Sequence, residues 1–133
     1  MTSALQTFAT RIAATRRIGK ADVQALRRDI LADGLGSRAE AEALIALDRR
    51  AVSVHATWPA TLIGLVTEFA VWTARPTGVV DQDLAAWLKP LLTGETASPR
   101  GARILAEILR EAHAVDESLK GLDMDMPSLP LAA

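Results

Sequence analysis

The sequence contains no cysteine, no tyrosine and only two phenylalanines among its 133 residues. Without cysteine the chain has neither disulfide bonds nor thiolate chemistry, which suits a reducing compartment, and we expect a cytoplasmic protein. Aromatic residues make up only 4% of the chain. Because strands are enriched in aromatic and β-branched residues, their scarcity disfavours a β-sheet fold. The abundant Ala, Leu, Arg and Glu favour helices instead.

The chain also lacks a long, uninterrupted apolar run. Its most apolar stretch, residues 57–74, contains Pro59, Glu68 and four threonines, and it is barely long enough to cross a membrane. We therefore interpret it as a buried helix and expect no membrane span. The N-terminal segment has its basic residues after its apolar ones, the reverse of a secretory signal peptide, so none is expected.

Charge of one sign is not in excess, since the formal net charge is −1. This balance gives no overall preference for nucleic acid or for a membrane surface. The distribution is uneven, however: residues 1–30 hold six basic and two acidic side chains, a net of +4, so the remainder carries −5.

The spacing of apolar residues predicts an all-α fold: a compact bundle of about six helices and no strands, in one domain over residues 1–120. Gly34 is expected to end the second helix in a left-handed conformation, and Pro90 to kink the fifth or end it at Lys89. Residues 121–133 are expected to be a loosely ordered tail. The expected helices span about residues 3–15, 21–32, 37–54, 58–74 and 81–92, and a sixth opens with Ser98 as cap and Pro99 at its first position.

A faint internal repeat divides this domain into two halves rich in helix-turn-helix elements, about residues 3–54 and 57–117. Gly19 and Asp22 precede a short helix in the first half, and Gly78 and Asp81 do so in the second. A glycine and then a serine cap follow each of these helices. Two such halves, packed face to face, would bury one shared core.

The stretch between the second and third helices offers a candidate metal site. With Gly34 at the sixth position of a calcium loop of the EF-hand type, Asp29, Asp33 and Glu40 fall at ligand positions 1, 5 and 12. Leu31 and Gly36 occupy positions that do not fit. The alternative is a helix-ending turn at Asp33-Gly34, followed by a capping box of Ser37 and Glu40.

Asp33-Gly34, together with Glu40 and Leu44, resembles the second half of an EF-hand. Two helix-loop-helix units in a cysteine-free chain resemble the tellurite-resistance TerB-like group of small helical proteins, over about residues 18–115. The resemblance implies duplicated helical units and calcium or another divalent metal held by acidic loop residues. The second unit has Gly78 and Asp81 in the corresponding arrangement, but Leu84 stands where the coordinating Glu would be.

The basic N-terminal part raises the alternative of a small nucleic-acid-binding regulator. Arg16, Arg17, Arg27 and Arg28 would contact phosphates, and the second and third helices would form a helix-turn-helix. The first turns of that recognition helix carry Glu40 and Glu42, which phosphates repel. Nucleic acid is therefore the less favoured partner, and these arginines also suit a solvated face or helix C-termini.

No catalytic constellation is visible, and we expect no enzyme. The chain has no nucleophile elbow, no glycine-rich phosphate loop and no local zinc motif. His55 and His113 lie near the ends of the third and sixth helices. They could meet across the repeat, or they could lie separately at helix ends.

The sequence therefore favours a non-enzymatic interaction or adaptor module whose partner is another protein or a second copy of the chain. Trp58, Trp72 and Trp87 are expected in the core or at its rim. An exposed Trp58 or Trp72 would instead mark a partner surface. The tail from Leu122 to Leu131 begins by alternating acidic and apolar residues, so it is either a docking motif for a partner or another copy, or an unstructured end.

Overall fold

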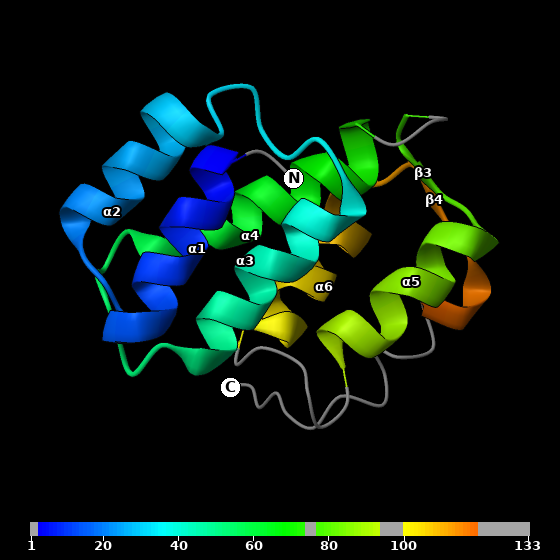
Figure 1. Ribbon diagram of the computed structural model, residues 1–133. Helices are drawn as coiled ribbons and strands as arrows, with labels where there is room; N and C mark the ends of the chain where they lie inside the picture. The colour runs from blue at the N-terminus through cyan, green and yellow to red at the C-terminus, as the bar shows by residue number, and fades with distance from the viewer. Residues whose placement is uncertain (1–2, 74–76, 94–99, 120–133) are drawn as a thin grey trace.

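The structure, a computed structural model, describes residues 3–73, 77–93 and 100–119. Within them the chain is mostly helical, which confirms the all-α fold class (Figure 1). Two of the helices continue into a π-helical turn, η1 (Leu26–Ile30) and η2 (Phe69–Thr73). The α-helices are α1 (Ser3–Thr15), α2 (Lys20–Ala25), α3 (Arg38–Arg50), α4 (Trp58–Glu68), α5 (Gln82–Leu92) and α6 (Gly101–Glu111).

The prediction of no strands is wrong, because four two-residue strands form two parallel pairs. β1 (Arg17–Ile18) pairs with β2 (Ser53–Val54). β3 (Val79–Val80) pairs with β4 (Ala114–Val115). Strands of two residues are too short to show the alternation by which a strand is read from sequence.

The two halves of the chain follow the same path: a helix, a strand, two helices and a second strand. The hydrogen bonds that close each half also correspond. The amide of His55 donates to the carbonyl oxygen of Ile18 at 2.7 Å, and the amide of Asp116 donates to that of Val80 at 2.8 Å.

This correspondence changes the residue pairs that the sequence pattern suggested. Arg16 and Gly78 each directly precede the first strand of their half, and the N-caps Gly19 and Asp81 each directly follow it. The pattern had paired Gly19 with Gly78, which is three residues out of register.

Two aspartates explain why the sequence pattern paired the wrong residues. Both cap the start of a helix, but Asp22 does so from inside the first turn and Asp81 from the N-cap position. The carboxylate of Asp22, inside the first turn of α2, accepts the amide of Gly19 at 2.8 Å. The carboxylate of Asp81, the N-cap of α5, accepts the amide of Leu84 at 2.9 Å. The same chemistry at positions three residues apart produces a similar sequence pattern.

One helix end differs from expectation. α3 ends at Arg50 rather than near Val54, because the chain turns into β2. α5 ends at Leu92, the expected bound, with Pro90 inside it, so of the two alternatives for Pro90 the one that ends the helix at Lys89 is wrong. The predicted start of the sixth helix at Ser98 and Pro99 lies outside the described residues, as does the tail from residue 120.

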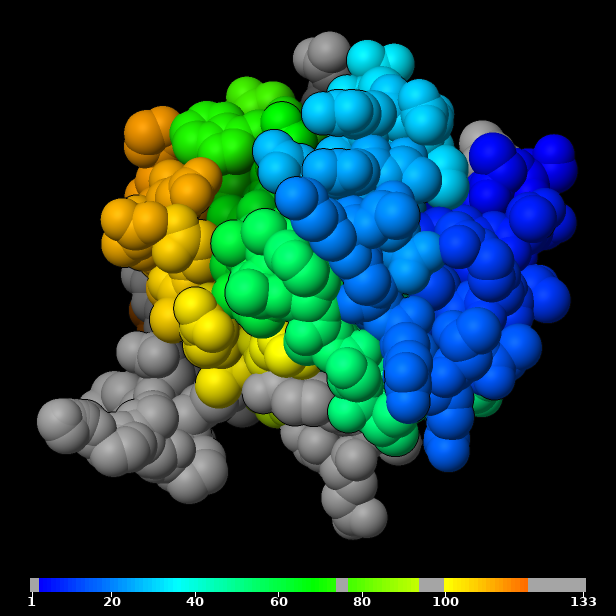
Figure 2. Space-filling view, turned by 90° about the vertical axis from the view of Figure 1, so that its left-hand side faces the viewer, coloured from blue at the N-terminus to red at the C-terminus, as the bar shows by residue number. Residues whose placement is uncertain are grey.

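One hydrophobic cluster extends through both halves. Figure 2 shows the face where α1, α2, α4 and α6 come to the surface. Gly101 opens α6 against the end of α5, where a Cβ would meet the carbonyl oxygen of Leu92. The largest fully buried side chains are Trp58, Phe8, Leu5, Ile12, Ile18, Leu26, Leu44, Ile45, Leu62, Leu88, Ile104 and Leu105.

Candidate interaction site

Each of the three tryptophans donates its indole N–H to a carboxylate. Trp58 donates to Asp48 at 2.9 Å, Trp72 to Glu111 at 3.0 Å and Trp87 to Glu42 at 2.7 Å. Their exposures separate their roles, because Trp58 is fully buried, Trp87 is half-buried and Trp72 is 42% exposed.

Trp58 belongs to a buried polar network. The carboxylate of Asp48, which is 1% exposed, accepts the indole N–H of Trp58 and a hydrogen bond from Arg100. Its second oxygen, Oδ2, has no hydrogen-bond partner. The sequence analysis missed Asp48, although its spacing of four residues from Leu44 places it on the buried face of α3. A buried carboxylate needs such partners to offset its desolvation.

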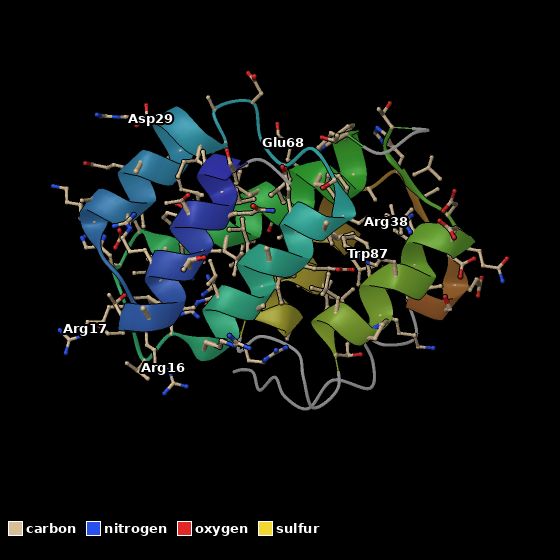
Figure 3. All side chains as sticks on the ribbon, in the orientation of Figure 1. Arg16, Arg17, Asp29, Arg38, Glu68 and Trp87 are labelled. Atoms are coloured by element: carbon tan, nitrogen blue, oxygen red, sulfur yellow. The ribbon has the colours of Figure 1, made fainter. Side chains whose placement is uncertain are left out.

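Trp87 joins the two halves of the fold. Its indole reaches Glu42 on α3, and its ring packs edge-on against Phe69 with 5.9 Å between the ring centroids. The guanidinium of Arg38 lies 5.3 Å from the Trp87 ring centroid and pairs with Asp83 at 2.7 Å. Figure 3 shows Arg38 and Trp87 together between α3 and α5. These contacts explain Trp87 as a structural side chain.

Trp72 has no such buried role. Its ring meets the ring of His113 edge-to-face, with centroids 5.8 Å apart. Among the residues described, it and Val52 are the large hydrophobic side chains that the solvent reaches most. By the criterion set from the sequence, this exposure makes Trp72 a candidate for a partner surface. We call Trp72, Glu111 and His113 the Trp72 surface.

The outer face of α6 adds acidic groups to this surface. Glu107 lies one turn before Glu111, and its carboxylate pairs with Arg110. The hydrogen bond from Arg110, followed by one with Glu111, holds the pKa of Glu107 below its ordinary value. The pKa of Arg110 is raised, chiefly by the same bond. Two carboxylates and one guanidinium therefore leave this stretch acidic.

The structure does not bring the predicted metal ligands together. Asp29 and Asp33 are exposed, whereas Glu40 is 7% exposed. Over the described ranges, which include all three, no group of three or more His, Cys, Asp or Glu side chains is placed to hold a metal ion. Glu40 instead accepts the amide of Gly36 at 2.7 Å, while Ser37 accepts that of Glu40 at 3.2 Å.

The helix-ending turn offered as the alternative is therefore present, and Gly34 has the expected positive φ of 85°. Ser37 caps α3 as expected, but the capping box differs from the prediction because Glu40 accepts the amide of Gly36 and not that of Ser37. Glu68, on the otherwise apolar α4, is exposed, and its Oε1 lies 3.2 Å from the position a Cβ would take on Gly34. A carboxylate thus lies over this turn from the second half of the chain.

The predicted nucleic-acid residues fall into two groups. Arg16 and Arg17 extend into solvent at the end of α1 (Figure 3). Arg27 and Arg28 lie in η1, one helix later, and are also exposed. Arg49 and Arg50, which the sequence analysis did not select, end α3 and precede β2, the strand beside Arg17. The structure therefore groups Arg16 and Arg17 with the end of α3.

The two histidines have separate surroundings. His55 Nδ1 accepts the amide of Thr57 at 3.2 Å and lies 2.9 Å from the Thr57 hydroxyl oxygen, at the start of α4. His113 lies beside Trp72, and its amide donates to Gly78. In the described part of the chain, no helix is both long and apolar enough to cross a membrane.

Comparisons with models of protein families, with curated proteins and with solved structures found no match to this chain. The resemblance to the TerB-like group and to an EF-hand stays a prediction.

Proposed function

We propose that this chain is a non-enzymatic adaptor of the cytoplasm whose Trp72 surface binds a basic segment of a partner protein. The observation that carries the proposal is the exposure of Trp72, 42%, in a chain whose other two tryptophans are used within the fold. The cytoplasmic setting rests on the absence of cysteine.

Trp72 is held in place before any partner arrives. The hydrogen bond to Glu111 and the edge contact with His113 restrict its ring while leaving much of it open to solvent. An aromatic side chain that is already ordered loses little conformational entropy on binding. Tryptophan is also among the residues that contribute most to protein interfaces.

The partner's chemistry follows from the groups beside the ring. A lysine or arginine can lie on the exposed face of an indole, where the ring's electrons attract a cation. Glu111 and Glu107 offer carboxylates next to the same position, and the guanidinium of Arg110 pairs with Glu107. A basic residue with an apolar neighbour therefore fits this surface better than an acidic one.

Selection from displayed short random peptides tests the proposal. The bait is the full chain, and the peptides that remain bound after washing are then measured against Trp72→Ala. We expect the remaining peptides to be rich in Arg or Lys beside an apolar residue. Trp72→Ala should weaken their binding by roughly 30-fold, the effect of losing a 2 kcal/mol anchor.

Val52→Ala is the matched control, because Val52 is the other large exposed hydrophobic residue and lies in the first half. It should leave the binding of these peptides unchanged. Acidic peptides, or basic peptides that bind Trp72→Ala equally well, would contradict the proposal.

A further inference from the structure

Arg16 has a backbone conformation that its residue type disfavours. Its φ is +59°, and apart from Gly34 and Gly78 no other described residue has a positive φ. The left-handed region is unfavourable for a residue with a side chain, which is why glycine usually occupies the position after a helix. The amide of Arg16 donates to Ile12 at 2.7 Å and thereby ends α1.

In the second half of the fold, a glycine has the same left-handed conformation without this strain. Gly78 occupies the position of Arg16, with φ of +78°. The Gly78 carbonyl accepts the amide of His113 at 2.7 Å, just as the Arg16 carbonyl accepts that of Val52 at 2.8 Å. The first half thus holds an arginine where the same geometry takes a glycine. Strain kept at an exposed side chain points to a role for that side chain.

The surroundings of Arg16 show what that role requires. Arg17 follows it in β1, and Arg49 and Arg50 end the neighbouring α3; all four side chains are exposed. Val52, whose amide donates to the carbonyl oxygen of Arg16, is 72% exposed. We call Arg16, Arg17, Arg49, Arg50 and Val52 the arginine surface.

Compensation of helix dipoles does not account for this arrangement. Basic side chains near helix C-termini are stabilising, and Arg17 alone would provide one for α1. A glycine at position 16 would remove the strain, and the positive charge of Arg17 would still lie at the end of α1. Arg16 therefore adds a positive charge that the dipole of α1 does not need. This charge lies beside the exposed Val52, whose amide is hydrogen-bonded to Arg16.

We propose that the arginine surface binds the acidic and apolar segment Leu122–Met126 of this chain. That segment reads Leu-Asp-Met-Asp-Met, so two carboxylates alternate with three apolar side chains. An extended segment with this alternation places its aspartates on one side and its apolar residues on the other. The aspartates match the arginines, and an apolar residue can cover Val52.

A nucleic acid fits the same surface less well. Its phosphates would pair with the arginines, but they would leave Val52 in contact with a charged backbone. The arginines also do not continue along a helix face or a groove, since Arg27 and Arg28 belong to another helix.

Because the chain contains no cysteine, disulfide cross-linking of the full chain gives a direct test. Ser53→Cys places a thiol in β2 next to Val52, and Ser128→Cys places one just beyond the acidic segment. The control pair combines Ser128→Cys with Thr73→Cys, an exposed position in η2. We expect the Ser53 pair to form its disulfide about fivefold faster or more than the Thr73 pair, as exposed ion pairs of this number allow.

Charge changes then test the cause. Asp123→Asn with Asp125→Asn should remove the advantage of the Ser53 pair. Arg16→Glu with Arg17→Glu should do the same, and adding Asp123→Arg with Asp125→Arg should restore it. The restored cross-link also shows that the arginine variants still fold. A disulfide within one chain and one between two chains both support the proposal, and a non-reducing gel shows which forms.

Equal rates for the Ser53 and Thr73 pairs would overturn the proposal, and so would a Ser53 advantage that persists in the aspartate variants. If the Ser53 pair forms its disulfide no faster than the Thr73 pair and duplex DNA binds these arginines, the proposal is overturned in favour of a nucleic-acid surface. Trp72→Ala should leave the cross-linking unchanged, so this proposal and the adaptor proposal can fail separately.

Discussion

Arg16 and Gly78 occupy the same position in the two halves of the fold, and both have a left-handed backbone, with φ of 59° and 78°. Each directly precedes the first strand of its half, and the carbonyl oxygen of each accepts the amide of the residue that precedes the second strand. The two halves therefore have the same backbone conformation at this position, with arginine in the first half and glycine in the second.

The first prediction follows from this pair. Arg16→Gly should raise the free energy of unfolding by about 0.5–1 kcal/mol, since relief of the left-handed strain exceeds the entropy that glycine adds to the unfolded chain. Chemical denaturation measures the change. Arg17→Gly is the control and should lower stability, because Arg17 is extended in β1.

The first prediction also includes the opposite change in the second half, which should be harmful. A Cβ on Gly78 would lie 2.6 Å from Cδ2 of the His113 ring, in addition to the positive φ. Gly78→Ala should therefore lower the free energy of unfolding by roughly 1–3 kcal/mol. His113→Ala made in the same chain should recover part of this loss. If Gly78→Ala is neutral, the correspondence between the two halves is wrong.

The buried carboxylate of Asp48 leads to a second prediction. Arg100→Leu removes a cationic partner and leaves the buried charge with the indole of Trp58, so we expect a loss of roughly 3 kcal/mol. In Asp48→Asn the same arginine change should cost much less. The coupling energy of this double-mutant cycle should exceed about 1 kcal/mol. Additive effects would show that the Arg100–Asp48 contact is unimportant.

A third prediction concerns pH. The side-chain and backbone hydrogen bonds from Ser118 lower the pKa of Asp116 from its ordinary value of 3.8. A lowered folded pKa means that Asp116 contributes stability above its unfolded pKa, and that this contribution is lost as pH falls through the folded value. Ser118→Ala should raise the pKa of Asp116 toward 3.8, as NMR titration of its carboxyl carbon would show. Because alanine keeps the backbone amide, an unchanged pKa in that variant would rule out the hydroxyl hydrogen bond as the main cause.

The fourth prediction concerns metal. Because Glu40 caps α3 and does not meet Asp29 and Asp33 in a ligand group, calcium should not raise the melting temperature of chelator-treated protein. Magnesium and zinc should also have no effect. A metal that binds the folded state would raise it by mass action, so a clear shift that Asp33→Ala abolishes would show a working metal site in this loop instead.

The helices could be predicted from sequence because their patterns are long and locally determined. The apolar spacing placed α1 at its observed bounds, and Ser37 with Glu40 marked the start of α3. Gly34 correctly identified a left-handed turn. Each of these signals lies within a few residues of the feature it predicts.

The strands and the sites depend on contacts between distant residues, which is why they were missed. Ser53 pairs with Arg17 from the far side of two helices, and two residues carry no period. Asp48 meets Arg100 only in the folded chain. The proposed role of Trp72 rests on its exposure, which the apolar pattern of residues 57–74 could not show.

The three indole N–H groups permit the most direct test of the adaptor proposal, because each has a different carboxylate partner. A ¹H–¹⁵N spectrum of the full chain should show three indole signals, assigned by Trp→Phe variants. As a selected basic peptide is added, the Trp72 signal should move and saturate, while the signal of buried Trp58 stays in place. Binding that leaves the Trp72 signal unchanged would show that the partner surface lies elsewhere.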